Sequence, residues 1–140
     1  MAIARELETL ELTPRFDVGL KSPLPHLHPG NTVFAILSFE GPDPYSNAGG
    51  LGVRVTELSH ALAQNGFPTH LYFVGDPDYP RVEQHWDGKL TYHRWCGWIS
   101  RFHPAGVYDG ENGKLGDFRA SIPPALIEDF IRPALQEGRH

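Results

Sequence analysis

Three glycines stand where a helix is expected to begin, after a predicted strand and a polar loop. Residues 32–39 are almost entirely apolar, and Gly49, Gly50 and Gly52 directly precede an amphipathic segment. Glycine lets the backbone approach a bound group closely. The unpaired N–H groups of a first helical turn, together with the helix dipole, favour an anion. The spacing therefore predicts a phosphate or diphosphate site, although a plain tight turn would use the same glycines.

Two common phosphate-binding motifs do not fit this turn. A Walker A loop ends in Gly-Lys-Ser/Thr, and no lysine follows Gly52. The dinucleotide fingerprint places three spaced glycines almost directly after the strand. Here Val55 stands where the third glycine belongs, and residues 41–49 separate strand from turn. The sequence therefore argues against both motifs.

The elements around the turn predict an α/β fold with a parallel sheet and flanking helices. Residues 32–39 carry apolar side chains on both faces, which is typical of a strand inside a parallel sheet. A helix is expected over residues 51–65, with Gly66 as its left-handed cap. Residues 69–74 are rich in β-formers and predict a second strand, which completes a right-handed β-α-β unit. The buried stripe of the helix is expected to be Leu51, Val55, Leu58 and Leu62.

Glu40 stands at the carboxyl end of the first predicted strand. In open α/β sheets, ligands bind beyond this end of the strands. Glu40 is therefore expected either to face the site or to be a solvated loop carboxylate.

A β-hairpin is predicted over residues 82–95, with its turn at Asp87 and Gly88. In that register His85 pairs with Leu90, and His93 points to the opposite face, which excludes a metal pair of His85 and His93. His26 and His28 have no third ligand nearby and are expected to be exposed. We expect no metal and no cofactor.

The last third of the chain predicts a long loop and then a helix. Residues 96–121 are rich in glycine and indicate an irregular loop. Four aromatic residues in this loop and directly before it fit either a sugar-stacking platform or, as we favour, a small cluster packed under the loop: Trp95, Trp98, Phe102 and Tyr108. A helix with an apolar stripe is expected from Ser121, and Pro133 should kink or split it.

Composition limits the function classes. The 140 residues suit one domain, with residues 1–30 as an extended lead-in and residues 31–140 as the folded part. The net charge of −5 gives no electrostatic footprint for nucleic acid. No apolar run is long enough to span a membrane. The single cysteine, Cys96, suits a reducing compartment, so a cytoplasmic location is expected.

Three motifs carry a resemblance to a known family: residues 38–42 (Ser-Phe-Glu-Gly-Pro), 48–52 (Ala-Gly-Gly-Leu-Gly) and 58–66 (Leu-Ser-His-Ala-Leu-Ala-Gln-Asn-Gly). They resemble the N-terminal part of the two-domain, twin-Rossmann (GT-B type) retaining glycosyltransferases, the group of glycogen and starch synthases. The match runs from about residue 32 to residue 95. Where glycogen synthases carry a lysine that is thought to contact the donor phosphates, this chain has Asn47.

The resemblance implies an incomplete N-terminal glycosyltransferase lobe with a Rossmann-like sheet. Its activity would be transfer of a hexose, glucose above all, from an ADP- or UDP-glucose type donor to a glucan or another acceptor. The site residues implied are Glu40, Asn47, Gly49, Gly50 and Leu51, and the catalytic residues stay unknown. The family's second lobe carries the Lys/Arg pair and glutamate motif, so this chain alone is expected to be inactive.

The sequence leaves a second reading open. The chain could be a non-catalytic, degenerate module that binds a sugar nucleotide, a glycan or a partner protein. In either reading an exposed apolar seam is expected, which a second-lobe chain or self-association would cover.

Overall fold

The computed structural model describes residues 26–95 and 98–137 of the chain. Most of the predicted lead-in and Cys96 therefore lie outside the described residues. The elements in chain order are β1 (Phe34–Leu37), α2 (Gly50–Gln64), β2 (Thr69–Val74), β3 (Val82–His85), β4 (Leu90–Trp95), α3 (Trp98–Phe102), α4 (Glu111–Leu126), a π-helical turn (Ile127–Ile131) and α5 (Arg132–Gln136).

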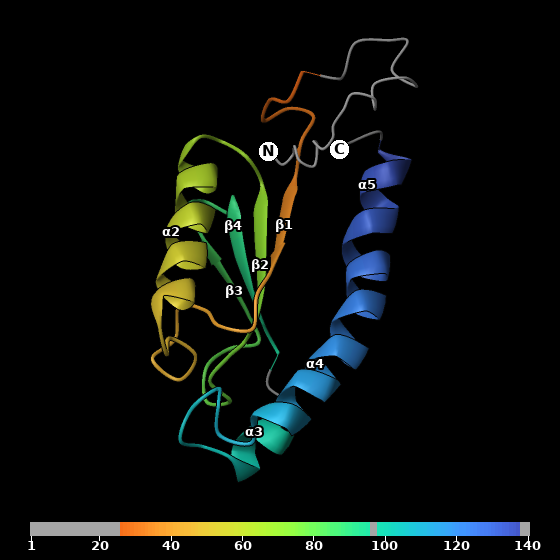
Figure 1. Cartoon of the computed structure of the whole chain (residues 1–140). Coiled ribbons are helices and arrows are strands. Elements are labelled where there is room, and N and C mark those ends of the chain that lie inside the picture. The colour runs from red at the N-terminus through yellow and green to blue at the C-terminus, as the bar shows by residue number, and fades with distance from the viewer. Residues whose placement is uncertain (1–25, 96–97, 138–140) are drawn as a thin grey trace, which may run out of the picture.

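The strands form a four-stranded open sheet in the order β1-β2-β4-β3. β1 and β4 both run parallel to β2, and β3 pairs antiparallel with β4. α2 covers one face and α4 lies along the other (Figure 1). This α/β architecture, with a mostly parallel sheet and flanking helices, is compatible with a Rossmann-like fold and confirms the β-α-β unit.

The position of β1 and the hairpin turn differ from expectation. β1 is an edge strand among the described residues, because β4 pairs on the far side of β2 and leaves β1 with one neighbour. The hairpin pairs His85 with Leu90 as predicted, but its turn occupies residues 86–89 rather than two residues.

Strand alternation builds two cores. β2 directs Leu71 and Phe73 toward α2, and Tyr72 and Val74 toward α4. The α2 side is completed by Ala63, Leu90 and Tyr92. The α4 side is completed by Trp95, Val107, Phe118 and Ile122. The sheet is thus the middle layer of three.

The predicted buried stripe of α2 is wrong at two positions. Leu51 and Leu58 are 49% and 50% exposed, and the buried residues are the small ones: Gly52, Ser59 and Ala63. Small side chains let the helix backbone lie close to the sheet, so the larger leucines turn outward. The left-handed cap is confirmed, since Gly66 has φ +90°.

The predicted loop over residues 96–121 is also wrong, because α3 and most of α4 lie there. Lys114, Phe118 and Ile122 are buried at helical spacing on α4. Gly113 and Gly116 each cost about 1 kcal/mol relative to alanine inside a helix. Burial of a Phe or Ile side chain contributes roughly 1.5–3 kcal/mol. Packing therefore outweighs the poor helix propensity that suggested a loop.

The helix split near Pro133 is confirmed. A π-helical turn over Ile127–Ile131 separates α4 from α5, and Pro133 is the second residue of α5. Proline has no N–H for the helical ladder, so the regular hydrogen bonding is interrupted here. The apolar stripe that the sequence placed on this helix is exposed at Ile127, Ile131 and Leu135. These residues form an exposed apolar stripe on the last helical segments. The apolar seam expected where strands are missing from the sheet stays a prediction.

No helix within the described ranges is both long and apolar enough to cross a bilayer.

Two glycine substitutions test the packing of the helices. A Cβ on Gly52 would lie 2.9 Å from the carbonyl oxygen of Gly41 and 3.2 Å from Cα of Asn47, whereas a Cβ on Gly116 meets nothing within 4 Å. We expect Gly52→Ala to lower the free energy of unfolding by about 1–3 kcal/mol. Gly116→Ala should raise it by roughly 0.5–1 kcal/mol. Urea unfolding measures both, and equal effects would contradict the close approach of α2.

Candidate functional site

Glu40 is buried at the carboxyl edge of the sheet and holds the start of α2. Its carboxylate is inaccessible, with the residue only 5% exposed. Oε1 accepts the backbone N–H of Gly52 at 2.8 Å, and Oε2 accepts the hydroxyl of Tyr108 at 2.5 Å. Glu40 is therefore not a solvated loop carboxylate. It supplies a negative charge at the positive end of the helix.

The bond to Glu40 also sets the ionisation of Tyr108. The hydrogen bond to the carboxylate, then burial, then the repulsion of Glu40 and Glu111 raise the pKa of Tyr108 to about 12. The phenol therefore stays neutral at neutral pH and donates its proton to Glu40. Tyr108 precedes α4 in the chain, so this contact joins that connection to the β1–α2 loop.

The glycine turn lies in front of Glu40 and is open to solvent. Gly49 is the N-cap of α2 in extended backbone, without a side-chain cap. Gly49, Gly50 and Leu51 are exposed, and a Cβ on Gly50 would meet nothing within 4 Å. A Cβ on Gly49 would have one neighbour, Oε2 of Glu40 at 3.9 Å. The turn thus presents backbone to solvent, with the carboxylate directly behind it.

Asn47 borders the same turn. The residue is exposed, and its Oδ1 lies 3.1 Å from the position of a Cβ on Gly52. The structure therefore brings together all five residues that the sequence singled out. Glu40 is behind the turn, while Asn47 and the segment from Gly49 to Leu51 are at its surface.

A buried ion pair that the sequence analysis missed fixes the loop between β1 and α2. The guanidinium of Arg94 donates to both oxygens of Asp43, with Nε–Oδ2 at 2.8 Å and Nη2–Oδ1 at 2.9 Å. Both side chains are 3% exposed. Arg94 also pairs with Glu83 at 2.7 Å, and Asp43 accepts the N–H of Asp76. The pair ties together the β1–α2 loop, the β2–β3 loop, β3 and β4.

Arg94 keeps its charge despite the burial. Desolvation acts against the charged form, but the hydrogen bonds to Asp43 and Glu83 outweigh it and raise the pKa of Arg94. One signal in the sequence was available: a lone arginine within a hairpin strand of β-formers, downstream of an aspartate in a proline-rich loop.

A second buried cation, Lys114 of α4, was missed as well. Its Nζ donates to the hydroxyl of Tyr45 and to the carbonyl oxygens of His103 and Gly106, the last two at 2.9 and 2.6 Å. Lys114 is completely buried. Three oxygens match the three N–H donors of an ammonium group, so the contact fixes the 103–106 loop against the β1–α2 loop.

The aromatic residues are divided between core and surface. Trp95 belongs to the core, as the cluster interpretation predicted. Trp98 and Phe102 of α3 do not: they are 67% and 71% exposed, with ring centroids 5.2 Å apart in an edge-to-face arrangement. α3 lies at the same end of the molecule as the glycine turn (Figure 1). The carboxyl edge therefore combines an open glycine turn with an exposed aromatic pair.

Comparison with known proteins identified no similar protein. Protein-family models, curated proteins and solved structures were each searched, and none of the three searches gave a match.

The buried pair predicts a large loss of stability on truncation. Asp43→Ala would leave the guanidinium of Arg94 without its main partner, and we expect the free energy of unfolding to fall by about 3–5 kcal/mol. Asp78→Ala is the control, because its ion pair with Arg101 is long (3.6 Å) and exposed. That change should cost less than about 1 kcal/mol. Urea unfolding of both variants measures the difference, and similar small losses would show that the pair contributes little.

The ionisation of Tyr108 gives an independent check on Glu40. The difference in tyrosinate absorbance between the native chain and Tyr108→Phe should titrate near the pKa of about 12. Glu40→Gln removes the carboxylate charge and should move that transition toward the usual tyrosine value. Because the unfolded chain loses this proton first, folding stability should fall between about pH 10 and 12. An unchanged transition in Glu40→Gln would contradict the contact.

Proposed function

We propose that this chain is the N-terminal lobe of a GT-B type glycosyltransferase, with the glycine turn at α2 as its contact with the phosphates of a nucleotide-sugar donor. The observation that carries the proposal is the open turn from Gly49 to Leu51 at the carboxyl edge of a parallel β-α-β unit. Ligands of open α/β sheets bind at this edge. N–H groups at the start of a helix suit a diphosphate.

The hydrogen bonds of Glu40 support a positioning role in this function. The carboxylate accepts a hydrogen bond from the backbone N–H of Gly52, while the preceding residues 49–51 stay exposed. Glu40 would therefore influence a bound nucleotide-sugar donor indirectly, through the conformation of the turn and the charge behind it. Its negative charge would lower affinity for a phosphate, so donor binding by this lobe should depend on short-range hydrogen bonds from the backbone.

The acceptor would be a glucan or another sugar. Trp98 and Phe102 support this part of the proposal, because exposed aromatic faces at the same edge suit the stacking of carbohydrate rings. Transfer of a hexose would require the second lobe, which in the resembling family neutralises the departing phosphate. The chain by itself is proposed to bind its ligands without catalysing transfer of the hexose. Self-association or a second-lobe chain would cover the exposed stripe of Ile127, Ile131 and Leu135.

A second candidate is a non-catalytic module that binds a glycan or a partner protein. The buried carboxylate of Glu40 favours it, because an anion already stands at the N-terminus of α2. In that case the aromatic pair on α3 would bind a sugar without any nucleotide at the turn.

Titration calorimetry with ADP-glucose, UDP-glucose and ADP separates the two candidates. We expect the native chain to bind at least one nucleotide and Gly50→Val to abolish binding, because the new side chain would stand where the phosphates approach. Gly116→Val is the matched control, since its Cβ also meets nothing within 4 Å but lies on α4. It should bind as the native chain does.

The opposite results are equally informative. Nucleotide binding that survives in Gly50→Val would place the site elsewhere. Absence of nucleotide binding in a folded native chain, with binding of a glucan oligosaccharide, would support the non-catalytic module.

A further inference from the structure

The turn between β3 and β4 holds a bulky residue in a backbone conformation that such residues rarely adopt. Trp86 and Asp87 have φ of 55° and 54°, in the left-handed region that favours glycine and asparagine. The N–H of Gly88 donates to the carbonyl oxygen of His85 at 3.2 Å and closes the turn. Strain of this kind persists only where other contacts hold the residue, so the side chain of Trp86 is expected to be anchored.

The anchor of Trp86 is a histidine of α2. Its indole Nε1 donates to Nδ1 of His60 at 2.7 Å, and the two rings lie edge to face with centroids 6.1 Å apart. On the other side of the imidazole, Nε2 of His60 lies 2.8 Å from the hydroxyl oxygen of Tyr92 on β4. His60 therefore joins α2 both to the turn and to β4.

The partners of His60 determine where its proton lies. An indole N–H can only donate, so Nδ1 of His60 accepts with its lone pair. The neutral ring therefore carries its proton on Nε2 and donates it to the hydroxyl oxygen of Tyr92. A protonated ring would keep this bond, because Nε2 still carries its proton. It would lose the bond to Trp86, because two N–H groups would then face each other.

We propose that His60 and Trp86 form a pH-sensitive latch between α2 and the turn of residues 86–89. The neutral ring of His60 holds Trp86, and the protonated ring releases it. Release removes the contact that restrains the left-handed backbone of the turn, while the bond from His60 to Tyr92 keeps α2 on the sheet. The latch lies at the amino edge of the parallel strands, because the turn directly precedes β4. It is thus separate from the glycine turn at the carboxyl edge.

The neighbouring groups keep His60 neutral near pH 7. Burial lowers its pKa from the ordinary value of 6.5, and the repulsion of His85 on β3 lowers it further. Nε2 of His85 itself lies 3.3 Å from Oε2 of Glu83 on the same strand. On β4, burial first and Glu83 second raise the pKa of Tyr92 to about 12, so its hydroxyl stays neutral. The other charged groups nearest to the contact along these elements are Glu57 on α2, Asp87 and Lys89 in the turn, which are exposed, and Arg94 on β4, which is paired with Asp43.

The lowered pKa of His60 links the latch to stability. As the pH falls, the unfolded chain takes up this proton first, near pH 6.5, and the folded chain takes it up only at lower pH. Folding stability should therefore decrease as the pH falls below about 6.5 and level off below the pKa of the folded chain. Release of Trp86 should follow the lower of these two pKa values, because it depends on protonation in the folded chain.

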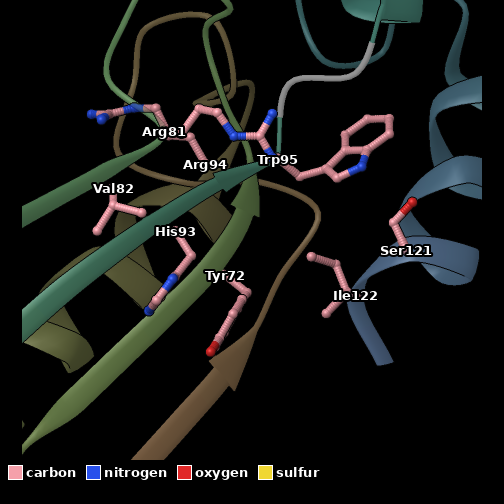
Figure 2. Close-up of a pocket in the computed structure, with 8 residues that line it drawn as sticks. All are labelled: Tyr72, Arg81, Val82, His93, Arg94, Trp95, Ser121 and Ile122. Carbon is pink, nitrogen blue, oxygen red and sulfur yellow. The ribbon is translucent and has the colours of Figure 1, made fainter. Parts of the chain in front are cut away.

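A second pair of histidines lies on the opposite face of the sheet. Nδ1 of His70 and Nε2 of His93 are 2.9 Å apart, which is an ordinary hydrogen bond between imidazoles. His93 stacks on Tyr72 and lines a cavity of about 320 Å³, of which α4 forms the other wall (Figure 2). Because these histidines are titratable too, the latch must be followed at individual rings and not through stability alone.

Nuclear magnetic resonance of the whole chain tests the latch through two signals. The ¹⁵N shifts of His60 should show an unprotonated Nδ1 and a protonated Nε2 at neutral pH. Acidification should protonate Nδ1 with a midpoint below 6.5. The indole N–H signal of Trp86, identified by its absence in Trp86→Phe, should move toward the position of an exposed indole with the same midpoint. Two different midpoints, or an Nδ1 that carries a proton at neutral pH, would contradict the latch.

Three variants separate the latch from general effects of acid. His60→Gln keeps an amide oxygen that can accept the indole N–H but takes up no proton, so the Trp86 signal should stay unchanged over the same pH range. Trp86→Phe removes the donor, so the midpoint of His60 should rise toward 6.5. His28→Gln is the control for an exposed histidine and should leave both midpoints unchanged.

Two results with these variants would overturn the proposal. One is a Trp86 signal that still moves with pH in His60→Gln, and the other is an unchanged midpoint of His60 in Trp86→Phe. Because the first titration uses the native chain, the test stands even where a variant fails to fold.

Discussion

The carboxylate of Glu40 is the contact on which the carboxyl edge of the sheet depends. The residue is buried and joins three parts of the chain: the loop after β1, the first turn of α2 through Gly52, and the connection before α4 through Tyr108. A buried carboxylate is unfavourable unless hydrogen bonds compensate it. Here both oxygens have donors, and the helix dipole adds a favourable field. The arrangement gives the glycine turn a fixed position.

Two buried cations complete this edge. Arg94 fixes the loop between β1 and α2 through Asp43, and Lys114 fixes the same loop through Tyr45. Each cation has its donors matched to oxygens, and Tyr45 of the same loop also packs against the apolar cluster on the α4 side. Polar contacts therefore hold this edge, and the residues exposed on it include the glycine turn and the aromatic pair of α3. This combination supports the proposed binding of phosphates and sugars through short-range contacts.

Local signals predicted the first part of the fold. The apolar strand, the glycine turn, the cap at Gly66 and the second strand all lie close together in sequence and specify a β-α-β unit. The pairing of His85 with Leu90 followed from alternation alone. The five candidate site residues are brought together for the same reason, because one strand end and one helix start determine their positions. From residue 96 onward the glycine-rich composition predicted a loop. That prediction was wrong, since Gly113 and Gly116 lie within a helix.

The sequence by itself determined the α/β class, the right elements up to Trp95 and the place of the turn, because short-range periodicity and turn chemistry fix these. Only the tertiary structure decided which side chains meet across elements. The contacts of Glu40 with Tyr108, Asp43 with Arg94 and His70 with His93 join residues far apart in the chain. It also decided which face of α2 is buried, because the close approach of helix and sheet selects small residues over leucines. Such contacts depend on register and distance in space, which periodicity along the chain does not encode.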